Sequence, residues 1–155
     1  MKIKHITVLL LSLPLFLFAS CKIGNFSDIG GFNDNGPLYV YAGGSSDIMT
    51  FKLDPGNGSL ERIEQRTLAG NVGSIIIDKE NKRLFASSYD RIYGFNINED
   101  GRLSDLAGYP VYPVPANEIN EIIFTQSNNF LFALYEVNTD LYGFIYSKPA
   151  GILTG

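Results

Sequence analysis

The sequence predicts an all-β fold, and three observations support this prediction. The 155 residues include 9 Tyr, 11 Phe and 16 Gly, and aromatic residues favour strands while glycine favours turns. Beyond the N-terminus, no stretch carries repeated apolar residues at helical spacing. Short apolar segments instead alternate with turn residues and recur with a period in the forties, which is typical of the blades of a β-propeller.

The period is visible in two sets of equivalent residues. One short apolar strand of each unit carries a leucine, and these leucines lie 46 and 47 residues apart: Leu38, Leu84 and Leu131. The next strand of each unit carries a phenylalanine at the matching point: Phe51, Phe95 and Phe144. The sequence therefore predicts three repeat units over about 38–72, 73–117 and 118–155.

The strands follow from alternation within each unit. The first unit predicts three strands, LYVYAG, DIMTFKLD and LERIEQRT. The second predicts four, GSIIID, RLFASSY, RIYGFNIN and LSDLAGYPV, and the third predicts three, NEIIFTQ, FLFALYE and LYGFIYS. Turns such as DPGNGS, NEDGR and TQSNN separate them and carry the Gly, Asn and Asp residues that tight turns require. The continuous apolar run in SIIID indicates a strand that is covered on both faces.

The N-terminal residues are typical of a targeting segment. Lys2 and Lys4 precede an apolar run over 6–19, which is shorter than the roughly 20 residues of a membrane-spanning helix. A positive start, a short apolar centre and small residues after it are typical of a secretory signal, so residues 1–20 predict a signal helix. Residues 21–37 are rich in Gly, Asn and Asp and predict a flexible tether.

The chain's only cysteine, Cys21, follows the signal directly. The segment Phe18, Ala19, Ser20 and Cys21 resembles the bacterial lipoprotein signal, although Phe18 stands where Leu is usual. This resemblance implies cleavage between Ser20 and Cys21, lipidation of Cys21 and a membrane anchor in the bacterial cell envelope. Lys22 replaces the acidic residue of inner-membrane retention, which favours the outer membrane. Two acyl chains suffice for stable anchoring. The alternative is ordinary secretion with a free thiol.

The repeat segments resemble a known family. FKLDPGNGSLERI, SIIIDKENKRLFASSYDRIYGFNINEDGRLSDL and NEIIFTQSNNFLFALYEVNTDLYGFIY are similar to lactonase-type (6-phosphogluconolactonase-like) seven-bladed propellers. The resemblance covers residue 38 to about 147. It implies that the SIIID type of strand lines a central channel, and that a complete relative opens sugar lactones.

The number of strands predicts an incomplete β-propeller. The chain supplies about two and a half four-stranded antiparallel blades, with KPAGILTG standing where a last outer strand should begin. Propellers close with 4–8 blades. We favour a truncated member of the family as the explanation. Completion of the ring by other chains, including self-association through the open blade faces, and a smaller stack of sheets are the alternatives.

Carboxylates are the candidate catalytic residues. The only histidine, His5, lies in the predicted signal, so the mature chain lacks an imidazole for base catalysis or zinc binding. Glu118 and Glu121 start the third channel strand, and Glu136 ends the strand that follows. A carboxylate can activate water beside an arginine that stabilises an oxyanion. The alternative is that these glutamates are solvated strand ends.

The family resemblance supports one of these candidate residues and not the others. It implies that Glu136 matches a family carboxylate, while Glu121 and Tyr135 depart from the family pattern. Five arginines are candidates for oxyanion stabilisation, and none lies on a strand assigned to the channel: Arg62, Arg66, Arg83, Arg91 and Arg102.

The sequence thus predicts a lipid-anchored envelope protein whose partial propeller is a non-catalytic binding or scaffold module, or a remnant; the alternative is a lactone hydrolase. No cofactor or metal site is predicted, because there is one cysteine and no phosphate-binding glycine motif. The net charge of −4 gives no attraction to nucleic acid. A protein or carbohydrate ligand is expected. The segment GYPVYPVPANE could present aromatic rings to it, or form a rigid connection between blades.

Overall fold

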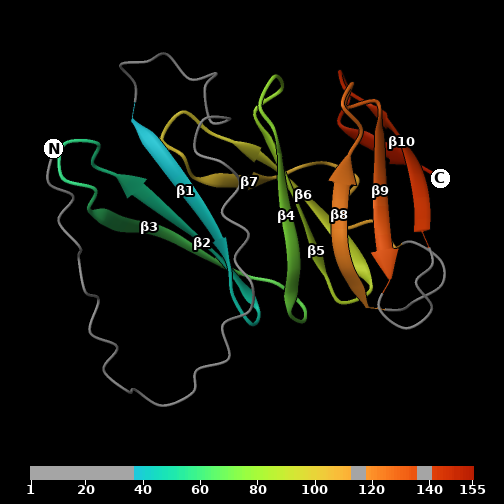
Figure 1. Ribbon diagram of the computed structural model, residues 1–155, viewed down its shortest axis with the longest axis horizontal. Coiled ribbons are helices and arrows are strands. Elements are labelled where there is room, and N and C mark those ends of the chain that lie inside the picture. The colour runs from blue at the N-terminus through green and yellow to red at the C-terminus, as the bar shows by residue number, and fades with distance from the viewer. Residues whose placement is uncertain (1–36, 113–117, 136–140) are drawn as a thin grey trace, which may run out of the picture.

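The computed structural model describes residues 37–112, 118–135 and 141–155, and these residues form three antiparallel sheets that follow one another along the chain (Figure 1). Each sheet is a meander in which sequential strands pair, because short turns join strands that alternate apolar and polar residues. We call the sheets blades 1, 2 and 3. The predicted all-β partial propeller is confirmed.

Blade 1 contains β1 (Leu38–Gly43), β2 (Asp47–Leu53) and β3 (Leu60–Thr67). Blade 2 contains β4 (Val72–Asp78), β5 (Arg83–Ser88), β6 (Arg91–Ile97) and β7 (Leu103–Asp105). Blade 3 contains β8 (Ile119–Phe124), β9 (Phe130–Tyr135), β10 (Leu141–Ser147) and β11 (Ile152–Thr154). The predicted signal, the cleavage point and nearly all of the tether lie outside the described residues. No helix in the described segments is long and apolar enough to cross a membrane.

Two strand predictions need correction. Blade 3 has a fourth strand, β11, where the sequence predicted none, because Gly151 takes a φ of 70° and its N–H donates to the Ser147 carbonyl at 2.7 Å. This tight turn returns the chain along β10, which pairs with β11 from Ile145 to Ser147. In blade 2 the outer strand β7 is only three residues long. The predicted strand breaks after Asp105, and Val111 alone returns to pair with Ile92.

The hairpin registers also revise one predicted equivalence. Leu84 pairs with Phe95, and Leu131 pairs with Phe144. In blade 1, however, Phe51 pairs with Val40, while Leu38 lies opposite Leu53. The β1–β2 turn is fixed by a hydrogen bond from the Gly44 N–H to the Asp47 carbonyl. Counting back from this turn places Val40, rather than Leu38, at the position that Leu84 and Leu131 occupy.

Neighbouring blades pack face to face, and an apolar core fills each of the two joints. The core between blades 1 and 2 contains Ile48, Leu68, Leu84, Ala86, Phe95, Ile97 and Leu103. The core between blades 2 and 3 contains Phe85, Ile92, Leu106, Ile119, Ile122, Leu131, Ala133, Tyr135, Phe144, Tyr146 and Leu153. Burying a large apolar side chain contributes about 1.5–3 kcal/mol, so these joints stabilise the packing of the blades.

The first strands of blades 2 and 3, β4 and β8, lie side by side (Figure 1). Gly73 in β4 allows a close approach, because a Cβ there would lie only 2.5 Å from the Ile119 carbonyl oxygen of β8. The Ser74 hydroxyl also reaches the Ile122 carbonyl at 3.4 Å. The inner edges of the two blades are therefore nearly in backbone contact.

Candidate functional site

The predicted site residues fall partly outside the described residues. Ser20, Cys21 and Glu136 lie there, so their predicted lipidation, cleavage and catalytic roles stay predictions. Glu121 is half-buried on β8, immediately after an irregularity in the pairing with β9. Glu118 is half-buried just before the same strand. Among the described residues, no group of three or more His, Cys, Asp or Glu side chains could hold a metal ion.

Arginines hold the outer edge of the joint between blades 1 and 2. Arg66 donates to the Leu103 carbonyl at 3.0 Å, lies 3.3 Å from the Asp105 carboxylate and stacks over the Phe95 ring at 5.1 Å. Arg102 donates from blade 2 to the Ile63 carbonyl of blade 1 at 2.6 Å. These two arginines therefore connect strands of neighbouring blades.

A buried polar network ties blade 2 to blade 3. Asp78 is fully buried and accepts hydrogen bonds from the Tyr146 hydroxyl and the Asn81 side-chain amide, each at 2.8 Å. Arg83 donates to the Tyr146 hydroxyl at 3.1 Å, to the Pro149 carbonyl at 3.1 Å and to the Lys148 carbonyl. Burial, together with the Asp78 carboxylate, raises the pKa of Tyr146 to about 12. The network joins the β4–β5 turn to the β10–β11 turn.

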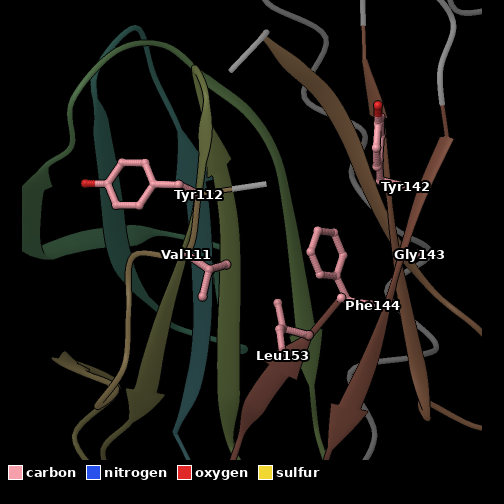
Figure 2. A pocket seen from close by; sticks show the side chains of 7 residues that line it. Val111, Tyr112, Tyr142, Gly143, Phe144 and Leu153 are labelled. Atoms are coloured by element: carbon pink, nitrogen blue, oxygen red, sulfur yellow. The ribbon is translucent and has the colours of Figure 1, made fainter. Parts of the chain in front are cut away.

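A cavity of about 370 Å³ lies at the other end of the same joint. Its lining comes from the segment after β7 and from β10, β11 and the C-terminal residue: Val111, Tyr112, Tyr142, Gly143, Phe144, Leu153 and Gly155. Figure 2 shows Val111, Phe144 and Leu153 pointing into the space, while the Tyr112 and Tyr142 hydroxyls point away from it. The cavity is therefore lined mostly by apolar surface, and its volume lies at the small end of the range for ligand pockets.

Tyrosines surround this cavity. The Tyr135 ring meets the Tyr142 ring edge-on at 5.1 Å, and burial raises the pKa of Tyr135 to about 12. Its buried hydroxyl has no hydrogen-bond partner among the described residues. Arg91 stacks over the exposed Tyr112 ring at 4.9 Å and pairs with Asp90 at 2.7 Å. Tyr112 lies in the segment GYPVYPVPANE, which the sequence singled out for its aromatic rings. No sequence pattern pointed to Tyr142, because only the register of β9 and β10 brings that ring to Tyr135.

One face of blade 3 carries most of the exposed large apolar side chains among the described residues. We call the face of a blade that looks toward the preceding blade its leading face, and the opposite face its trailing face. Seven large apolar side chains lie on the trailing face of blade 3, and all but Phe132 rank among the exposed large hydrophobics, at 36–60 % exposure: Ile123, Phe130, Phe132, Leu134, Leu141, Ile145 and Ile152. Clusters of this kind mark interaction surfaces.

Known structures share this architecture. The chain matches a protein from Lactobacillus plantarum with a TM-score of 0.67 at 14 % identity, over 78 % of this chain and 37 % of that one. It matches the Pseudomonas aeruginosa periplasmic gluconolactonase PpgL with a TM-score of 0.63 at 21 % identity, over 76 % and 34 %. A proposed 6-phosphogluconolactonase from Bacteroides fragilis gives 0.60 at 19 % identity, over 71 % and 32 %.

These matches show that the chain has the fold of part of a β-propeller, and they confirm the resemblance seen in the repeats at the level of the fold. The chain spans about a third of the length of these solved structures. No protein-family model and no curated protein matches the sequence.

Proposed function

We propose that this chain is an envelope-anchored, non-catalytic binding module whose binding surface is the trailing face of blade 3. The observation that carries the proposal is the exposure of large apolar side chains on that face. Equivalent positions of blade 2, such as Phe85 and Ile92, are fully buried against blade 3. An exposed apolar surface of this kind favours a protein surface as the ligand.

Cross-linking inside cells tests this surface. A photoreactive phenylalanine analogue in place of Ile145 should form protein–protein cross-links on illumination. The same analogue in place of Gln126, an exposed residue in the β8–β9 turn, should form few. Equal yields at the two positions, or none at either, would contradict the proposed binding surface.

Anchoring through Cys21 completes the proposal. It is supported by the apolar run that precedes this cysteine and by the small residues Ala19 and Ser20. Bacteria fed a labelled fatty acid should incorporate the label into the wild-type chain, which should then sediment with membranes. The Cys21→Ser variant should lose the label and leave the membrane fraction. A labelled Cys21→Ser chain would show that the anchor lies elsewhere.

The second candidate function is lactone hydrolysis. It is favoured by the likeness to a periplasmic gluconolactonase, and Glu121 and Glu136 are its candidate bases. If the module is non-catalytic, gluconolactone should open at the uncatalysed rate in the presence of the full chain. A clear acceleration that the Glu121→Gln or Glu136→Gln variant removes would establish the hydrolase instead.

A further inference from the structure

A strained tyrosine stands at the turn between β5 and β6. Ser88 pairs with Arg91, so Tyr89 and Asp90 form a two-residue hairpin turn. Tyr89 has a φ of 55°, in the left-handed region that is unfavourable for a bulky residue and that such a turn usually gives to glycine. Tyr89 is nevertheless 53 % exposed, so burial of its ring offsets little of this strain. A strained residue whose side chain lies in solvent points to a role in binding.

Neighbouring segments hold Tyr89 in this conformation. Its N–H donates to the Asn71 carbonyl at 3.3 Å, and its carbonyl accepts from the Ile119 N–H at 2.8 Å. Gly70 lies against it, because a Cβ on this glycine would be only 2.8 Å from the Tyr89 Cβ. The buried Ser88 hydroxyl donates to the Gly70 carbonyl at 2.8 Å and ties the same loop to β5. The backbone of the turn is therefore fixed from several sides, and a preorganised contact loses little conformational entropy on binding.

An ion pair and a second exposed ring continue from this turn. The Asp90 carboxylate lies 2.7 Å from the Arg91 Nε, and the Arg91 guanidinium stacks over the Tyr112 ring at 4.9 Å. Tyr112 is exposed, and its hydroxyl points away from the cavity (Figure 2). We call these four residues, Tyr89, Asp90, Arg91 and Tyr112, the Tyr89 surface. It combines two aromatic rings with a carboxylate and a guanidinium.

The charges of the Tyr89 surface favour a neutral ligand. Asp90 and Arg91 neutralise each other, so these four residues carry no net charge that would attract an ion. The pair still offers hydrogen bonds, because its contact uses one of the five guanidinium N–H donors and one carboxylate oxygen. A ligand with adjacent hydroxyl groups can accept from Arg91 and donate to Asp90. The C–H groups on the flat face of a sugar ring can pack on an aromatic ring, so a neutral saccharide meets both requirements.

We propose that the Tyr89 surface binds a neutral saccharide, with a sugar ring stacked on Tyr89 and its hydroxyls hydrogen-bonded to the Asp90–Arg91 pair. Tyr112 positions the guanidinium by stacking against it. The binding is non-covalent and leaves the saccharide unchanged. The site shares no residue with the trailing face of blade 3, so it goes beyond the proposed function and stands or falls separately from it.

An array of immobilised neutral and acidic glycans tests the proposal with the full chain kept in detergent. We expect the chain to be retained on at least one neutral glycan. The soluble oligosaccharide of the same structure should then bind saturably in isothermal titration calorimetry. Retention on acidic glycans alone, or on no glycan, would overturn the proposal.

Substitution of Tyr89 tests the site itself. Tyr89→Gly should weaken binding of that oligosaccharide at least tenfold, because it removes the stacking ring. Its urea midpoint should not fall below that of the wild type, since glycine accepts a positive φ. Tyr89→Phe, which keeps the ring, should bind within a few-fold of the wild type. A lower urea midpoint for Tyr89→Gly would show that the ring supports the fold, and would overturn the inference that it serves a ligand.

Lys82→Gly is the matched control. Lys82 has a φ of 51° in the turn at the other end of β5, so this change relieves the same kind of strain without removing an aromatic ring. Its affinity for the oligosaccharide should equal that of the wild type. Wild-type affinity in Tyr89→Gly, or an equal loss in Lys82→Gly, would overturn the proposed site.

Discussion

The joint between blades 1 and 2 and the joint between blades 2 and 3 have similar apolar layers but different polar contacts. In the first joint, the Tyr41 hydroxyl donates to the Gly101 carbonyl at 2.8 Å, and Glu64 accepts from the Leu103 N–H at 2.7 Å. In the second, the Asp78 carboxylate is fully buried and bonded to Tyr146. Apolar layers pack without requiring particular polar partners, whereas a buried polar network requires them.

The largest effect should come from Phe85, whose ring meets Tyr109, Phe124 and Tyr146 at 5.4–5.7 Å. We expect Phe85→Ala to lower the free energy of unfolding by about 3–5 kcal/mol, because it opens a cavity in a packed joint. Phe51→Ala, on the half-exposed leading face of blade 1, should lower the free energy of unfolding by clearly less. Urea unfolding measures both, and equal losses would show that the two positions are equally buried in solution.

The polar contacts themselves can be compared by deleting one hydroxyl from each joint. Tyr146→Phe should cost about 1–3 kcal/mol, because it removes a partner from the buried Asp78 carboxylate. Tyr41→Phe removes a hydrogen bond between neutral groups, and should cost about 0.5–1.5 kcal/mol. Urea unfolding of the two variants and the wild type measures which joint loses more free energy of unfolding. A larger loss for Tyr41→Phe would reverse the comparison.

Alkaline pH should weaken the molecule through its buried tyrosines. Burial raises the pKa of Tyr146 and of Tyr135 to about 12 in the folded chain, above the ordinary value of 10.0. The folded state thus keeps protons that the unfolded state has lost, so stability present below pH 10 is lost as the pH rises towards 12. Between these values Tyr146→Phe should unfold with about one proton fewer released. The free energy of unfolding of the wild type and of Tyr146→Phe is measured across this pH range. If it fell with pH at the same slope for both proteins, the expectation would be contradicted.

The smallest effect should come from an ion pair at the edge of the second joint. Lys148 lies 3.4 Å from the Glu80 carboxylate, whose side chain is 72 % exposed. Lys148→Met should therefore change the free energy of unfolding by about 0–1 kcal/mol. The difference from the wild type should vanish in about 1 M salt, where exposed charges are screened. A difference that survived high salt would assign the effect to packing of the lysine stem.

The sequence predicted most strands because alternating residues reveal which segments are half-buried. It missed β11, since three residues after a turn carry little periodicity, and it matched Leu38 instead of Val40 to Leu84 because a hairpin register depends on its turn. The contact between Asp78 and Tyr146 joins residues 68 apart, which no local pattern contains. Open blade faces were predicted from the number of blades, but their residues required the registers.

The glycine at position 73 has a geometric consequence. Two blades that nearly touch along their inner strands, yet are held apart by full side chains farther out, enclose a wedge. The angle of that wedge sets how many blades complete a turn, because narrower wedges need more of them. A methyl group at Gly73 would push the inner edges apart and so reduce the angle between the two blades. One hydrogen atom in place of a side chain thus helps to fix the curvature of the whole array.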